Sequence, residues 1–132
     1  MQLSFDEVGE ILDAMAETFP PVFYRELNGG ILLQEEEKQD PLFPEGEMFF
    51  LGEYIQDPYM GCYINLYYGS FAALAEKEDW TREDWEDELY TTLAHEFTHH
   101  IEGLAMLGGL DRKDEEELAE FRRYYKNRFP EE

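Results

Sequence analysis

The sequence predicts an α+β fold in which a sheet of three short strands packs against about four helices. Two patterns carry this prediction. Apolar residues recur at steps of three and four near both ends of the chain, as they do on one face of a helix. Short apolar runs bounded by Gly, Pro and Asp occupy the middle of the chain, as strands do. At 132 residues, the chain is expected to be one domain, residues 1–132, with a single core.

The first helix is expected from Ser4 to Phe19. Ser4 and Glu7 have the spacing of a capping box, and Pro20 and Pro21 follow as a stop. One or two further turns are expected before Asn28-Gly29-Gly30. The core stripe of this helix comprises Phe5, Val8, Leu12, Met15 and Phe19.

Three strands are expected next, at Ile31–Gln34, Glu47–Gln56 and Cys62–Tyr68. The second and third can pair as a hairpin through the turn at 57–61, whereas the sequence does not say which strand lies at the edge of the sheet. Between the first two, the charged run 35–41 is expected to be a solvated loop.

A short helix is expected at Phe71–Lys77, with Ser70 as a candidate cap. Ser70 is not interpreted as a nucleophile, because no Gly-x-Ser-x-Gly elbow surrounds it.

The strongest helix prediction is Thr81–Met106, which contains no Pro. Thr81 and Asp84 match a capping box, and Gly108-Gly109 supplies a stop. At about 100° per residue the segment has two faces. The apolar face carries Trp85, Leu89, Tyr90, Leu93, Phe97, Ile101 and Leu104. The polar face carries Glu88, Thr91, Thr92, His95, His99 and Glu102.

The polar face contains a His-Glu-x-x-His pattern at His95, Glu96 and His99. On a helix, residues four apart lie one turn above each other, so the two imidazoles can share one tetrahedral Zn²⁺. Glu96 then lies beside the open coordination position, as a general base for water. The neighbouring His100 falls near the edge of the apolar face, and we expect it to be partly buried with one hydrogen bond.

A zinc enzyme needs a third protein ligand. Glu102 shares the face of both histidines and is the first candidate, either on the metal or hydrogen-bonded to a histidine. Asp111 and Asp114 follow the Gly108-Gly109 turn and can fold back toward the site, so they are the alternatives.

The run Glu88-Leu-x-x-Thr-Leu-x-His-Glu-Phe-x-His-His-x-Glu102 resembles the small bacterial zincin-like metallopeptidases, or minimal zincins. Weaker similarity lies in Leu27-Asn28-Gly29-Gly30-Ile31, in Leu51-Gly52-Glu53-Tyr54 and in Tyr67-Tyr68-Gly69-Ser70-Phe71. The resemblance implies a short mixed sheet against helices, a zinc-type metal on the two histidines, and Glu96 as general base. Related members carry Gly and Asp seven and ten residues after the first His, where this chain has Glu102 and Ala105. The Asp ligand of the family therefore has no counterpart here.

These observations predict a zinc metallopeptidase that hydrolyses peptide bonds, with Glu96 activating the metal-bound water. Tyr63, Tyr67 and Tyr68 are candidates for steadying the oxyanion. The alternative is a non-catalytic domain that binds a metal or a peptide, and a third possibility is an acidic interaction domain whose motif is degenerate.

Composition limits the partners. The net charge of −22 excludes nucleic acid and anionic membranes as expected partners. It favours the binding of cations and suggests that a peptide substrate is basic. A last helix at Asp114–Arg128 has acidic residues first and basic residues last, which suits its dipole. Because Cys62 is the only cysteine and neither a signal peptide nor a membrane span is recognisable, we expect a cytoplasmic protein. The oligomeric state is left open.

Overall fold

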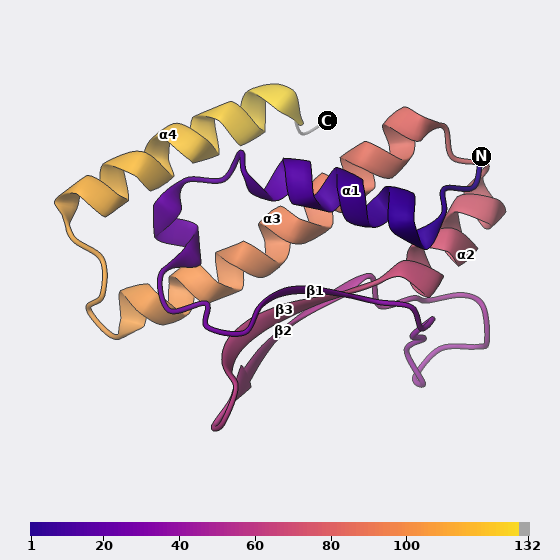
Figure 1. The fold of residues 1–132 in the computed structure, drawn as a ribbon, viewed down its shortest axis with the longest axis horizontal. Coiled ribbons are helices and arrows are strands. Elements are labelled where there is room, and N and C mark those ends of the chain that lie inside the picture. The colour runs from indigo at the N-terminus through magenta and orange to yellow at the C-terminus, as the bar shows by residue number, and fades with distance from the viewer. Residues whose placement is uncertain (130–132) are drawn as a thin grey trace.

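A computed structural model describes residues 1–129 of the chain. It confirms the α+β class, with four helices and a three-stranded mixed sheet in the described part. In chain order the elements are α1 (Phe5–Ala16), the 3-10 turn η1 (Pro21–Tyr24), β1 (Gly30–Gln34), β2 (Gly52–Asp57), β3 (Gly61–Tyr67), α2 (Tyr68–Glu78), α3 (Arg82–Met106) and α4 (Arg112–Arg128). Figure 1 shows the sheet along one side of the molecule. In this view α3 crosses above the sheet, and α1 and α4 also lie above it.

The sheet has the strand order β1-β3-β2. β1 is parallel to β3 and β2 is antiparallel to it, so the predicted hairpin is confirmed and both β1 and β2 are edge strands. β2 is shorter than predicted, because residues 48–50 pair with the charged loop instead of β3. The Phe50 N–H donates to the Lys38 carbonyl, and the Asp40 N–H donates to the Met48 carbonyl.

The first helix begins as predicted but ends three residues early. Ser4 and Glu7 form the expected capping box. After Ala16 the chain tightens into a turn, in which the Thr18 N–H and hydroxyl both donate to the Met15 carbonyl. The helix cannot run on to Phe19, because the residue before a proline disfavours helical dihedrals. Phe19 is nevertheless buried.

The cap predicted at Ser70 is wrong. α2 begins at Tyr68, so Ser70 lies inside its first turn and is fully buried. Its hydroxyl accepts from the Lys38 N–H at 2.8 Å and donates to the Lys38 carbonyl at 3.1 Å. Ser70 therefore fixes the loop after β1 to α2. Gly69 allows this contact, since a Cβ there would lie 2.5 Å from the Glu37 nitrogen.

The long helix α3 has the predicted limits. Thr81 and Asp84 form the capping box at its start. At its end, Gly108 has a φ of +71° and donates to the Ala105 carbonyl, while Gly109 donates to the Leu104 carbonyl. This is a Schellman motif, in which glycine accommodates the left-handed residue.

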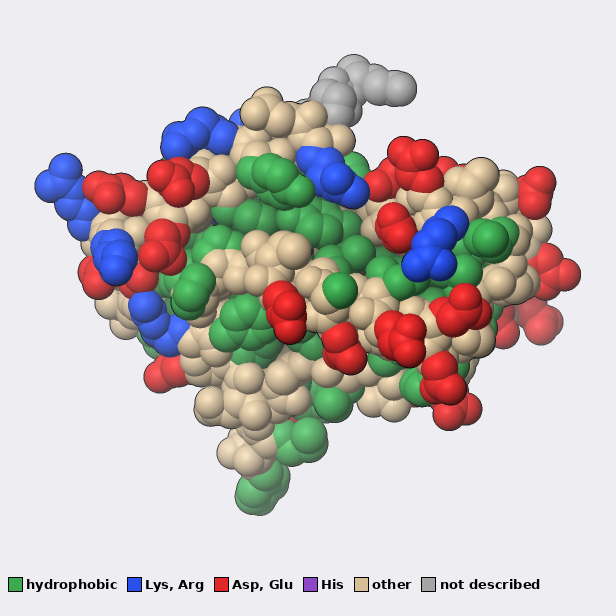
Figure 2. All heavy atoms as spheres, turned by 45° about the horizontal axis from the view of Figure 1, so that its top comes forward, with side chains coloured by type: hydrophobic (Ala, Val, Ile, Leu, Met, Phe, Trp, Pro, Cys, Tyr) green, Lys and Arg blue, Asp and Glu red, His purple; other side chains and the backbone are tan. Residues whose placement is uncertain are grey.

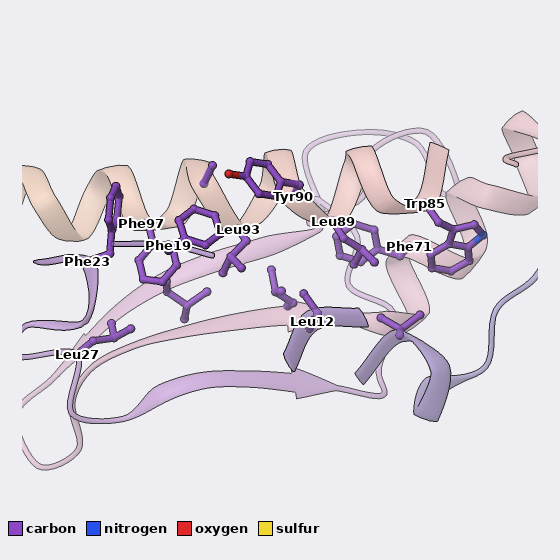
Figure 3. Close-up of a cluster of buried hydrophobic side chains, with 14 of the residues drawn as sticks. Leu12, Phe19, Phe23, Leu27, Phe71, Trp85, Leu89, Tyr90, Leu93 and Phe97 are labelled. Atoms are coloured by element: carbon purple, nitrogen blue, oxygen red, sulfur yellow. The ribbon is translucent and has the colours of Figure 1, made fainter. Parts of the chain in front are cut away.

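The apolar face of α3 forms the centre of the core, as predicted. The buried residues of this face are Trp85, Leu89, Tyr90, Leu93, Phe97, Ile101 and Leu104. Figure 3 shows Leu93 and Phe97 near Phe19 and Phe23 at one end, and Trp85 and Leu89 near Phe71 at the other. Burying this face turns the opposite face of α3, with His95 and His99, outward.

The last helix begins at Arg112, two residues earlier than predicted. Asp111 is its N-cap, and Asp111 and Asp114 form a capping box. Asp114 also accepts two hydrogen bonds from the Arg25 guanidinium, at 2.5 and 2.9 Å. This ion pair fixes the start of α4 to the segment that follows η1.

Acid is expected to break the Arg25–Asp114 pair. The Arg25 guanidinium and the Asp111 N–H lower the pKa of Asp114 to about 2, below the ~3.9 of an unfolded chain. The stabilisation by Asp114 is therefore complete above pH ~4 and is lost as the pH falls toward ~2. In urea titrations, the midpoint difference between wild type and Asp114→Asn should shrink across that interval. Asp13→Asn, at an exposed position on α1, should change the midpoint little; a pH-independent difference for Asp114→Asn would contradict the expectation.

Candidate metal centre

The His-Glu-x-x-His pattern lies in the middle of α3, and its three polar side chains come together. The Nε2 atoms of His95 and His99 are 3.3 Å apart, and their rings are nearly perpendicular, at 85°. One ligand atom from each of His95, Glu96 and His99 lies within 4.8 Å of the others. In residues 1–129 this is the one cluster of its kind. We call it the His-Glu-His cluster.

The spacing of the two imidazoles fits zinc. Two nitrogens at 2.0–2.1 Å from one tetrahedral ion are about 3.3 Å apart, which matches the observed separation. Both histidines are exposed, so an ion can reach them from solvent. Imidazole nitrogen with carboxylate oxygen is also a donor set that zinc accepts. The residues present therefore fit a zinc ion.

Glu96 differs from the histidines in burial, since it is only 6% exposed. Burial raises the pKa of its carboxyl, while the adjacent His95 and His99 lower it and Glu53 raises it; the net direction is upward. A carboxylate whose pKa is raised toward the working pH is a better proton acceptor than an ordinary surface glutamate.

Glu102 lies beside the cluster rather than within it. Its Oε2 is 3.8 Å from Nδ1 of His99, whereas Nε2 of the same ring faces His95. A histidine that binds a metal through one nitrogen commonly donates its other N–H to a carboxylate. At 3.8 Å the two atoms are too far apart for a hydrogen bond, so an orienting role for Glu102 and its role as a direct ligand both stay predictions.

The other two candidates for the third ligand are engaged elsewhere. Asp111 accepts from the Asp114 N–H at 2.9 Å, and both carboxylate oxygens of Asp114 bond Arg25. Asp111 caps the start of α4 and Asp114 forms the ion pair with Arg25, so neither is part of the His-Glu-His cluster.

His100 is more buried than predicted, with 1% exposure and two hydrogen bonds rather than one. Nε2 lies 2.6 Å from the Arg25 carbonyl, which can only accept, so this nitrogen donates. Nδ1 lies 2.7 Å from the hydroxyl of Tyr54. Because burial raises the pKa of Tyr54 to about 12, that hydroxyl keeps its proton and donates to Nδ1. His100 thus links α3 to β2 and to the segment after η1.

Two of the three tyrosines considered for the oxyanion have structural partners. The Tyr68 hydroxyl donates to the Leu3 carbonyl at 2.6 Å, and the Tyr67 hydroxyl donates to Glu53 at 2.8 Å. Glu53 also accepts from Lys38. Burial alone raises the pKa of Glu53, but these two hydrogen bonds outweigh it and lower the pKa. No pattern in the sequence indicates this network, because Lys38 comes from the charged loop.

A cavity of about 470 Å³ adjoins the cluster, between α3 and α4. His95 and Glu102 line it from α3, and Arg122 and Lys126 line it from α4. The sequence-based interpretation assigned these two basic residues to the helix dipole alone. Their spacing of four places them on one face of α4, and that signal was available in the sequence.

Fold and cluster together define an α+β protein with a candidate metal-binding helix. No family model matches the chain, and no curated protein matches it. A solved structure does: a conserved hypothetical protein from Thermo thermophilus is 32% identical, with a TM-score of 0.64, over 77% of this chain and 97% of that one. The chain therefore belongs to the same family as that protein. Within residues 1–129, no helix has the length and apolar character needed to cross a membrane.

Proposed function

We propose that this protein is a zinc-dependent metallopeptidase in which His95 and His99 hold the ion and Glu96 is the general base. The observation that carries the proposal is the 3.3 Å separation of the two Nε2 atoms, with an oxygen of the buried Glu96 carboxylate within 4.8 Å of a ring nitrogen of each histidine. When bound, zinc supplies a Lewis acid that polarises a carbonyl group and makes a water molecule more acidic. We assign the activity to the cytoplasm, since a chain with a single cysteine suits a reducing compartment.

The chain's own residues suit the hydrolysis of a peptide bond. The Glu96 carboxylate accepts a proton from the attacking water and passes it to the nitrogen of the leaving amine. The products are a carboxylic acid and an amine, so that one water is consumed per bond.

The edge strand β2 supports the proposal, because a free strand edge can bind an extended substrate backbone. The Tyr67 N–H donates to the Leu51 carbonyl, and alternation in an antiparallel pair then leaves the backbone groups of Gly52, Tyr54 and Gln56 at the open edge. Two contacts show that β2 runs along α3. A Cβ on Gly52, at the start of β2, would meet Thr92, and Gln56, near its end, lies next to Gly103. An extended peptide added to this edge would run beside the His-Glu-His cluster.

A second function, metal binding without catalysis, is favoured by one observation. The described part of the chain brings only two histidines and Glu96 itself into the cluster. If Glu96 were the third ligand, its negative charge would be committed to the ion, and its carboxylate would be a much weaker acceptor for the proton of a water. The site would then hold a metal without turning over.

Glu96→Gln is expected to keep bound zinc and to lower peptide hydrolysis by about 10²–10⁴-fold. Glutamine preserves the shape of the side chain but cannot take a proton. The measurement is zinc content by elemental analysis together with hydrolysis of casein and of a fluorogenic peptide mixture. Glu83→Gln, which removes the same charge from an exposed position on α3, is the control and should match wild type. Unchanged turnover would remove Glu96 as the base, whereas loss of zinc would favour the non-catalytic function.

A further inference from the structure

The cavity between α3 and α4 has an apolar interior and a charged rim. Its volume of about 470 Å³ lies in the range of small-molecule sites. The apolar residues that line it are Phe23, Ala94, Ile101, Leu118, Phe121, Tyr125 and Phe129. A large apolar side chain that entered it would bury part of its surface against these residues.

The rim on α4 is positive. Arg122 and Lys126 are exposed, and neither forms an ion pair within residues 1–129. By contrast, Arg112 pairs with Glu116 and Arg128 pairs with Asp87. Figure 2 shows one face of the molecule, on which acidic side chains are spread widely around apolar surface. In a chain with a net charge of −22, two unpaired cations beside an apolar cavity are complementary to an anion.

We propose that this cavity binds the C-terminal residue of a peptide substrate, with the apolar side chain inside and the α-carboxylate at Arg122 and Lys126. The proposal rests on the proposed peptidase function, because His95 belongs both to the cavity lining and to the His-Glu-His cluster. A C-terminal residue meets both requirements at once, since its side chain and its carboxylate share one Cα. The free carboxylate is recognised by charge-assisted hydrogen bonds from Arg122 and Lys126.

The rim also sets the orientation of the bound residue. Glu102 lines the α3 side and repels a carboxylate, whereas the α4 side attracts it. The carboxylate therefore lies toward α4, and the peptide bond before the terminal residue lies toward α3, beside His95. Water added across that bond releases one apolar amino acid from the end of the peptide. The cavity therefore selects peptides with a free C-terminal carboxylate, whereas the net charge of the whole protein favours basic peptides.

The test is a comparison of N-acetyl-leucyl-phenylalanine with its C-terminal amide, measured by calorimetry on protein freed of metal so that nothing is cleaved. We expect the acid to bind at least about tenfold more tightly than the amide. Arg122→Gln/Lys126→Gln should reduce the affinity for the acid to that for the amide. Raising the salt concentration should narrow the difference between the two ligands, because the contact is exposed.

Two control variants separate a specific contact at the rim from a general effect of charge. Lys113→Gln/Arg123→Gln removes the same charge from exposed positions on α4 that do not line the cavity, and it should keep the preference for the acid. Thr98→Trp, which fills the cavity from α3, should lower the affinity for both the acid and the amide. Equal affinities for acid and amide, no binding of either, or the same loss in the Lys113/Arg123 variant would overturn the proposal.

The outcome is distinguishable from that of the peptidase proposal. If wild type does not prefer the acid over the amide but its hydrolysis still depends on Glu96, only the assignment of the cavity is overturned. Acid-selective binding without any hydrolysis would support the assignment and overturn the peptidase function.

Discussion

His99→Ala is expected to abolish zinc binding, whereas His100→Ala keeps zinc and loses stability. The two residues are neighbours in sequence, but α3 turns them to different surroundings. His99 is exposed, and its Nε2 lies 3.3 Å from that of His95. His100 is 1% exposed and bonds Tyr54 and the Arg25 carbonyl.

The physical reasons for the two effects differ. Removing one of two imidazoles leaves zinc without a chelating pair, while an exposed alanine on a helix changes the free energy of unfolding little. Removing the buried His100 ring leaves the Tyr54 hydroxyl and the Arg25 carbonyl without their partner and opens a cavity, which should cost about 2–4 kcal/mol.

The measurements are zinc content of stripped and reloaded protein and the free energy of unfolding from urea titration of the metal-free form. Wild type should hold one equivalent. Zinc retained in His99→Ala would remove the metal centre, and a metal-free His100→Ala as stable as wild type would contradict its structural role. Glu102→Ala should keep one equivalent but bind it about 10–100-fold more weakly, as expected of a residue that orients a ligand.

Phe97→Ala is expected to lower the free energy of unfolding by about 3–5 kcal/mol. Phe97 is fully buried although it lies between His95 and His99 in sequence. Its ring centroid lies 4.8 Å from that of Phe19, 5.2 Å from that of Phe23 and 5.3 Å from that of Tyr24. Alanine would remove all three contacts and leave a void that a close-packed core cannot refill.

The check is urea denaturation of the metal-free proteins, with Thr98→Ala as the matched control. Thr98 is the next residue along α3 and is exposed, so its truncation should change stability by no more than about 0.5 kcal/mol. A small loss for Phe97→Ala would mean that α3 does not anchor the core through this face. Well below its unfolding temperature, the variant should still bind zinc, because the histidines lie on the opposite face.

Local interactions explain why much of the fold could be predicted. The limits of α3 follow from a capping box at Thr81 and a Schellman motif at Gly108 and Gly109, both of which depend on residues a few positions apart. Its buried face follows from helical periodicity. The cap predicted at Ser70 failed because a distant segment intervened. Ser70 bonds Lys38, 32 residues away, and so became a tether between segments instead of a cap.

The same division holds for the candidate site. The spacing of His95, Glu96 and His99 is a property of one helix, so the sequence by itself determined that these side chains lie together. Only the tertiary structure decided that β2 is an edge strand, that Asp114 forms an ion pair with Arg25, and that α4 forms a cavity with α3. Contacts of this kind join residues far apart along the chain, such as His100 and Arg25, which are 75 positions apart. Helical periodicity reports which face of a segment is apolar, whereas the partner of that face depends on how the whole chain packs.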